Sequence, residues 1–192
     1  MTTDIKKDGS VRAGMRLVVL LVEFAIAALV ITLPIRFFIA QPFLVSGTSM
    51  APTLVQNDYL VIDKLWYRLH APERGDVIIM RYPFDPSVYF VKRIIGLPGE
   101  TVSITNGSIT ILSQDGTSKK LQEPYIITQN GDTNNSVTTL AKDEYFVLGD
   151  NRSQSSDSRD WGPLQGKFIV GRAFMRLLPL DKIDLLPGEY RY

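Results

Sequence analysis

The chain has 192 residues, a net charge of +1 and 45% hydrophobic residues, which fits one globular domain with an additional segment. Its 21 Lys and Arg residues are balanced by 20 Asp and Glu residues and form no long basic run, which argues against a nucleic-acid-binding face. With one His and no Cys, the sequence excludes thiol catalysis and cysteine-ligated zinc, and we expect neither a metal nor a cofactor.

The first predicted element is a membrane-spanning helix near the N-terminus. Residues 17–40 are apolar with few exceptions, and roughly 20 helical residues suffice to cross the ~30 Å hydrocarbon layer of a bilayer. We place the span at residues 17–38, after a cytoplasmic segment formed by residues 1–16. Glu23 lies about two turns inside it, where we expect a protonated or interface-directed carboxyl group rather than one that binds a partner.

A cleavable signal peptide is the alternative interpretation, because a basic start and Ala25-Ile26-Ala27 are typical of such peptides. The charge of Glu23 and the apolar continuation to Leu33 count against it. Basic residues are more frequent before the span than after it, so the N-terminus is predicted to be cytoplasmic and residues 39–192 to lie outside. These residues are Lys6, Lys7, Arg12 and Arg16 before the span and Arg36 after it.

The remainder of the chain is predicted to be mainly β, with antiparallel sheets, because short apolar or alternating runs are separated by Gly, Pro, Asn and Asp. Asn106-Gly107 predicts a two-residue type I′ hairpin. Residues 129–136 contain nothing to bury and predict a mobile loop. Residues 102–140 are more polar than their flanks and predict an inserted sub-region. The candidate strands are residues 59–63, 77–81, 88–95, 101–105, 108–112, 144–148 and 168–178.

Ser49 is the candidate nucleophile, although a serine in such a loop can also satisfy a turn or cap a helix. A serine needs a base to become nucleophilic, and in a chain with one His that base would be a lysine or a carboxylate. Lys92 is the candidate base, because it lies among apolar residues of a predicted strand; the alternative is an ordinary lysine on the outer face. Its neighbour Arg93, pointing to the other face, could destabilise the lysine charge by like-charge repulsion or form an ion pair, and we favour the ion pair.

The expected burial of Lys92 has a chemical purpose. A lysine with an ordinary pKa near 10.4 is neutral in only about one molecule in ~2,500 at pH 7, at a cost of roughly 4.6 kcal/mol. Apolar surroundings disfavour the charged form and would lower that cost, so a buried lysine can serve as a general base.

Four motifs occur in order along the chain. They are Ser49-Met50-Ala51-Pro52-Thr53, Arg74-Gly75-Asp76-Val77, Val91-Lys92-Arg93-Ile94-Ile95-Gly96-Leu97-Pro98-Gly99, and Gly149-Asp150-Asn151-Arg152 followed by Ser155, Asp157, Ser158 and Arg159. With these motifs the chain resembles the bacterial type I signal peptidases, from the span to about residue 178, and within them the single-span Gram-positive-like branch. The resemblance implies an antiparallel β-sheet fold shared with LexA-like self-cleaving repressors. It also implies a membrane-bound serine endopeptidase that cleaves signal peptides from exported preproteins through an acyl-enzyme.

The resemblance also implies a role for each matching residue. Ser49 aligns with the nucleophile and Lys92 with the general base of the family. Ser155 aligns with a serine whose hydroxyl holds the lysine amine, and Asp157 and Arg159 align with a supporting ion pair. Without the other motifs, residues 153–159 would be interpreted as a solvated loop.

One position departs from the family pattern. Many family members have a serine two residues before the nucleophile, where its hydroxyl joins the oxyanion hole, but here that residue is Gly47. The backbone N–H of Ser49 remains as a donor. Thr48, Ser46 or a backbone group is expected to replace the missing hydroxyl, unless the enzyme does without it; loss of one such donor can cost ~10² to 10³ in rate.

The expected substrates and partners follow from the resemblance. Secretory preproteins with small residues at positions −1 and −3 are the implied substrates, and Val45, Met50 and Ile94, with Leu44, are the candidate pocket residues. The lipid bilayer and the translocation machinery are the other expected partners. An apolar group of residues is predicted either to dip into the bilayer or to pack in the core; it comprises Phe43, Leu44, Trp66, Tyr67 and Leu69. We expect His70 to be an exposed loop residue with no identifiable partner.

Three alternative functions are open at this point. A relative that processes a single pilin or transfer protein would share every motif. The self-cleaving repressors share the catalytic core but lack a membrane span. A non-catalytic membrane-tethered β-domain is disfavoured because the chain retains both Ser49 and Lys92.

Overall fold

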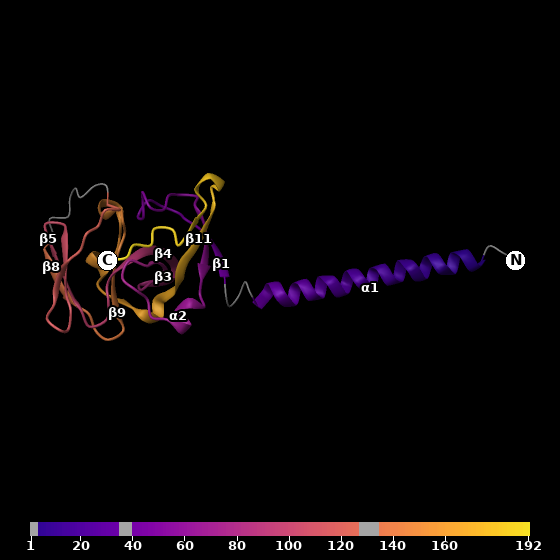
Figure 1. Cartoon of the computed structure of the whole chain (residues 1–192), viewed down its shortest axis with the longest axis horizontal. Coiled ribbons are helices and arrows are strands. Elements are labelled where there is room, and N and C mark those ends of the chain that lie inside the picture. Colours follow the sequence, from indigo (N-terminus) through magenta and orange to yellow (C-terminus); the bar gives the residue numbers. More distant parts are fainter. Residues whose placement is uncertain (1–3, 35–39, 127–134) are drawn as a thin grey trace. The chain divides into compact units, whose positions relative to one another are not determined.

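The computed structural model describes residues 4–34, 40–126 and 135–192, and the chain divides into two compact units, residues 1–39 and 40–192. The first unit contains one long helix, α1 (Asp4–Pro34) (Figure 1). Its residues 14–32 have a mean hydropathy of 2.4, so this helix is long and apolar enough to cross a membrane. Residues 35–38 of the predicted span lie outside the described residues.

The second unit is built on a large antiparallel sheet with the strand order β1-β2-β11-β3-β4-β9-β10, and β12 pairs with β11. The strands are β1 (Ala40–Leu44), β2 (Tyr59–Asp63), β3 (Val77–Tyr82), β4 (Asp85–Gly96), β9 (Glu144–Leu148), β10 (Leu164–Gln165), β11 (Ile169–Leu178) and β12 (Asp184–Leu185). Strand β4 is the longest in the sheet, and its second half pairs with both β3 and β9.

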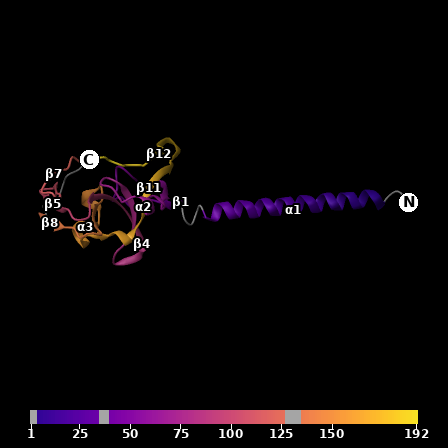
Figure 2. The ribbon, with the colours of Figure 1, turned by 60° about the horizontal axis from the view of Figure 1, so that its bottom comes forward.

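A smaller antiparallel sheet with the order β7-β6-β5-β8 occupies the part of the chain where an inserted sub-region was expected. Its strands are β5 (Thr101–Thr105), β6 (Ser108–Leu112), β7 (Ser118–Lys120) and β8 (Ser136–Thr139). The hairpin between β5 and β6 turns at Asn106 and Gly107, which have φ angles of 49° and 74°, as a type I′ turn requires. Figures 1 and 2 show β5 and β8 together on the side of this unit away from β11.

Helices are few and short in the second unit, as the mainly β prediction implies, and that fold class is confirmed. They are α2 (Trp66–Leu69), α3 (Ser158–Trp161) and the 3-10 turns Arg152–Gln154, Gly166–Phe168 and Leu180–Lys182. All seven predicted strands are present, whereas β1, β7, β8, β10 and β12 were not predicted. Most of the loop predicted at 129–136 lies outside the described residues, and Ser136 already belongs to β8.

The two sheets of the second unit share a hydrophobic core. Strands β5 and β6 alternate between buried and less buried residues, so each presents one apolar face. This face packs against the ends of β4 and β9, and Phe146 of β9, which is 1% exposed, belongs to the cluster. Because Phe146 belongs to the large sheet and packs with residues of the small one, its side chain joins the two.

We therefore expect Phe146→Ala to lower the free energy of unfolding by about 3–5 kcal/mol, because it leaves a cavity where the sheets meet. Urea unfolding followed by circular dichroism measures this change. Phe84→Ala is the matched control: Phe84 is 74% exposed, and its loss should change stability by less than ~0.5 kcal/mol. Equal effects of the two substitutions would contradict this account of the core.

Candidate active site

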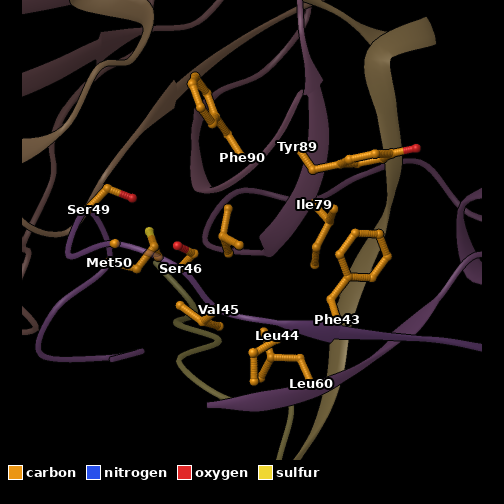
Figure 3. A pocket seen from close by; sticks show the side chains of 12 residues that line it. Phe43, Leu44, Val45, Ser46, Ser49, Met50, Leu60, Ile79, Tyr89 and Phe90 are labelled. Carbon is orange, nitrogen blue, oxygen red and sulfur yellow. The ribbon is translucent and has the colours of Figure 1, made fainter. Parts of the chain in front are cut away.

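Ser49 lies in the connection between β1 and β2, on the wall of a pocket of about 110 Å³. Ser46 and Gly47 line the same pocket, and Gly47 has a φ of +92°, a backbone conformation that favours glycine. Met50, next to Ser49, is 2% exposed and anchors the connection in the core. Figure 3 shows Ser49 at one end of the pocket and Phe90 and Tyr89 of β4 across from the β1 side.

The backbone around Ser49 is fixed to the segment that follows β9. The N–H of Asn151 donates a hydrogen bond to the carbonyl of Ser49 (3.0 Å), and its side-chain Nδ2 donates to the carbonyl of Thr48 (3.2 Å). The hydroxyl of Thr48 donates to Oε1 of Gln154 (2.7 Å). The conformation of the serine loop therefore depends on residues about one hundred positions further along the chain.

Lys92 lies on β4, directly opposite Ile78 of β3, and is 2% exposed. Its ammonium nitrogen is 5.1 Å from the centre of the Phe90 ring, and Phe90 also lines the Ser49 pocket. The lysine is thus not on an outer face.

The burial of Lys92 changes its acidity. Desolvation lowers the pKa of Lys92 to about 8, although the nearby carboxylate of Asp157 partly opposes this effect. At pH 7 about one molecule in ten then has a neutral amine, and the cost of deprotonation falls to about 1.4 kcal/mol. Lys92 can therefore act as a base near neutral pH.

Gly149 separates Ser49 from Ser155. A Cβ atom at Gly149 would collide with the hydroxyl oxygen of Ser155 and with the carbonyl oxygen of Ser49. The Ser155 oxygen is buried and has no hydrogen-bond partner in the part of the chain that the structure describes. Buried hydroxyl groups are almost always hydrogen-bonded, so this oxygen has bonding capacity left for another group in the site.

Asp157 is fully buried and begins α3 as the N-cap of a capping box. Its carboxylate accepts hydrogen bonds from Nε and Nη2 of Arg159 (2.8 and 2.9 Å) and from the backbone N–H of Gly149 (3.0 Å). The carboxylate of Asp157, held by Arg159, thus fixes the backbone of Gly149 beside Ser49. It also places a negative charge near Lys92.

A second and fully buried ion pair joins Arg93 to Asp150. Nε and Nη2 of Arg93 donate to the two carboxylate oxygens of Asp150 at 2.8 and 2.6 Å, and the hydroxyl of Thr53 donates to one of them at 2.5 Å. The expectation of an ion pair at Arg93 is confirmed, and its partner is Asp150. Arg93 follows Lys92, Asp150 follows Gly149 and Thr53 belongs to the serine loop, so the pair connects all three segments.

The pocket residues differ in part from the predicted set. Val45, Met50 and Leu44 line the pocket, whereas Ile94 is fully buried and packs with Ile78, Met80 and Tyr145 in a core cluster. The reason is alternation along β4: Ile94 lies on the face of the sheet that it shares with Val147 of β9, whereas the pocket residues Tyr89 and Val91 point to the other face.

Two aromatic residues that sequence reasoning missed also line the pocket. The rings of Phe43 and Tyr89 meet edge to face with 5.2 Å between their centres. Alternation along the strand could have suggested Tyr89, but Phe43 lies in a strand that was not predicted.

The five residues proposed as one apolar face have different surroundings. Phe43 and Leu44 line the pocket, and the hydroxyl of Tyr67 donates to Asp76 at 2.7 Å. Trp66 stacks on His70 with 3.9 Å between ring centres and also contacts the guanidinium of Arg172. His70 is exposed as expected, but it has a partner. Leu69 is 72% exposed.

Among the described residues, no group of three or more His, Asp or Glu side chains could bind a metal ion. What the site contains is a serine at an apolar pocket and a buried lysine on the strand that lines the opposite wall. Such an arrangement is suited to serine hydrolases that use a lysine as the base.

Comparison with known proteins identifies the family. Residues 18–178 match the family described as "Signal peptidase, peptidase S26". "Probable signal peptidase I-1" of Synechocystis sp. is 38% identical over 168 residues, which cover 84% of this chain and 83% of the relative. "Signal peptidase I P" of Bacillus subtilis subsp. natto is 32% identical over 172 residues, which cover 84% and 90%. A crystal structure of a signal peptidase I from Enterococcus faecalis aligns with a TM-score of 0.46 at 30% identity, covering 54% of this chain and 97% of that one.

The protein is a serine peptidase with one helix suited to anchor it in a membrane. It belongs to the signal peptidase family, peptidase S26, whose members remove signal peptides from secretory preproteins.

The buried pair gives a stability prediction. Asp150→Asn should lower the free energy of unfolding by about 3–5 kcal/mol, because it leaves the charge of Arg93 buried without its counterion. Thermal unfolding at several denaturant concentrations measures the change. Lys142→Ala, at an exposed position, is the control and should change stability by less than ~0.5 kcal/mol. Unfolding of Asp150→Asn at the wild-type midpoint would show that the pair is dispensable.

Proposed function

We propose that this protein cleaves signal peptides with a Ser49/Lys92 dyad through an acyl-enzyme. The observation that carries the proposal is the environment of Lys92, which is buried and has a pKa near 8. The two residues that precede it on β4, Phe90 and Val91, line the pocket that contains Ser49. A base of suitable pKa is thus held on the strand that faces the nucleophile.

In this mechanism the neutral amine of Lys92 accepts the proton of the Ser49 hydroxyl while Oγ attacks the scissile carbonyl carbon. The resulting ammonium group then gives a proton to the leaving amine, and the new N-terminus departs. Lys92 next accepts a proton from a water molecule that attacks the acyl-enzyme and gives it to Oγ of Ser49 as the ester bond breaks. The signal peptide leaves with a new carboxylate, and Ser49 is regenerated. The hydroxyl of Ser155, with its unused bonding capacity, is proposed to hold the lysine amine.

The oxyanion of the tetrahedral intermediate needs donors. The backbone N–H of Ser49 is proposed as the first one. The hydroxyl of Thr48 already donates to Gln154, whereas Ser46 lines the pocket. We therefore assign the second donor to Ser46 in preference to Thr48.

The pocket supports a preference for small residues at positions −1 and −3. Its volume of about 110 Å³ is far below the ~300–1,000 Å³ of pockets that hold drug-sized ligands. Residues 89–91 of β4 pair with β3 on one side, and β9 begins to pair only at Arg93. With β1 at the edge of the sheet, an extended peptide can bind between these two edges by adding a strand, and alternate side chains then enter the pocket.

The membrane orientation is part of the proposal. The basic residues before the span favour a cytoplasmic N-terminus and a catalytic domain, residues 39–192, on the outer side of the membrane. Exported preproteins reach that side together with the ends of their signal peptides. The translocation machinery is accordingly a proposed partner.

The dyad is tested by cleavage of a preprotein with an Ala-x-Ala site, with the cut position read by mass spectrometry. Ser49→Ala and Lys92→Ala should each lose roughly 10⁴-fold or more in kcat. Lys92→Arg should be equally inactive, because a guanidinium group is not deprotonated in proteins. Ser155→Ala should lose less, since it removes only a positioning hydrogen bond. Lys142→Ala is the control, and an active Lys92→Arg enzyme would refute the dyad.

The pH dependence gives an independent test. Only neutral Lys92 can accept a proton, so kcat/KM should rise with pH and reach half of its maximum near pH 8. The carboxylate of Asp157 stabilises the ammonium form, so Asp157→Asn should move this half-maximum to lower pH. Initial rates on a peptide substrate between about pH 6 and 10 measure both effects. A flat profile in this range would argue against Lys92 as the base.

A further inference from the structure

The end of the chain, residues 187–192, lies beyond the part that matches the family, residues 18–178, and outside the strands. This C-terminal segment runs back across the β domain, as the last part of the yellow trace in Figure 1 shows. The segment contacts the buried ion pair of Arg93 and Asp150, which adjoins the candidate active site.

Gly188 contacts the ion pair between Arg93 and Asp150. Nη1 of Arg93 donates hydrogen bonds to the carbonyl oxygens of Gly188 and of Gly75, the latter at 3.0 Å. Gly188 has a φ of +79°, and a Cβ atom there would collide with the side chain of Thr53. The glycine thus lies directly on Thr53, whose hydroxyl binds Asp150.

Tyr125 covers the other side of the guanidinium, and two tyrosines of the segment hold Tyr125 in place. The Tyr125 ring lies 3.9 Å from Cζ of Arg93, and Tyr190 packs edge-on against Tyr125 with 5.6 Å between ring centres. Tyr192 packs on Tyr190 at 4.9 Å, and its hydroxyl is hydrogen-bonded to that of Tyr125. Arg93 is fully buried as a result.

Tyr125 also connects the segment to Gly149. The hydroxyl of Tyr125 donates to Glu123 at 2.9 Å, and Glu123 is paired with Arg152. Nε of Arg152 donates to the carbonyl of Gly149 at 3.1 Å. Two sets of contacts from the end of the chain therefore converge on the dipeptide Gly149-Asp150, which lies against Ser49 and Ser155.

We propose that Gly188, Tyr190 and Tyr192 of this segment form a positioning element of the active site, which clamps Asp150 and Gly149 and thereby sets the geometry and the charge around Lys92. This inference rests on the proposed Ser49/Lys92 mechanism. The charged groups that act on Lys92 are Asp157, Arg159, Asp160 and Asp150. If the clamp is removed, water reaches the Arg93–Asp150 pair and the neighbouring Lys92, and hydration of the amine stabilises the ammonium form that burial now disfavours.

The test uses the full chain in detergent with three changes: a stop codon after Leu186, Tyr190→Ala, and Tyr192→Phe, which removes one hydroxyl and keeps the ring. Truncation should lower kcat roughly tenfold to 10²-fold, because small displacements of catalytic groups have effects of this size. KM should change less than about twofold, since the segment is not among the pocket-lining residues. The half-maximum of the pH profile should move to higher pH, and the two tyrosine variants should show smaller changes in the same directions.

Arg191→Ala is the matched control within the segment. Its side chain is 61% exposed and pairs with Glu73 and Glu189 at the surface, so kcat and the pH profile should match those of the wild type. Thermal unfolding of every variant is recorded in parallel. If the truncated chain does not fold, the two tyrosine variants decide the question.

The outcomes separate this inference from the proposed function. Cleavage by Ser49→Ala would refute the dyad and this inference with it. If Ser49→Ala is inactive but the tail variants keep the wild-type kcat and pH profile, the dyad stands and the clamp is refuted, even where the melting temperature falls. A lower kcat with the pH profile moved to higher pH, in variants that remain folded at the assay temperature, would support the clamp.

Discussion

The buried ion pair of Arg93 and Asp150 is the interaction on which the arrangement of the site depends. Removing two charges from water is costly, and the attraction between them compensates only when the geometry is good and the remaining donors are satisfied. Here the guanidinium binds the carboxylate through two nitrogens and also donates to two backbone carbonyls. Because each partner adjoins a residue of the site, this local requirement fixes the separation of β4 from the segment after β9.

Lys92 and Arg93 are adjacent basic residues of one strand with different functions, one as the proposed proton acceptor and one as a permanent cation. Neighbouring residues of a strand point to opposite faces, so the two side chains enter different environments. Arginine keeps its proton in any protein environment and suits a permanent ion pair, whereas a buried lysine can lose its proton. The site needs one group that stays protonated and one amine that can lose and regain its proton. Adjacent positions of β4 supply both.

Much of the fold could be predicted from local patterns. Alternating residues indicated the strands, and Asn106-Gly107 indicated the tightest hairpin, because these signals lie within a few residues. Strand β1 was missed because Pro42 interrupts its pattern; it lies at the sheet edge, where proline is tolerated. The motifs indicated Ser49 and Lys92, but not Asp150 as the partner of Arg93, since nothing local relates positions 57 residues apart. Ile94 was assigned to the pocket because it is near Lys92 in sequence, whereas its side chain packs in the core on the face that it shares with Val147.

The small sheet lies between Arg93 and Asp150 in sequence, so it belongs to the loop that their ion pair closes. The entropy cost of closing a loop grows only with the logarithm of its length, so adding or removing residues there changes the cost little. The β5–β6 hairpin is a local structure, and its antiparallel strands return the chain toward its starting point. The small sheet can therefore change in length and sequence during evolution while the two ends of the loop remain at a constant distance, which separates the part of the domain free to diversify from the part that performs the chemistry.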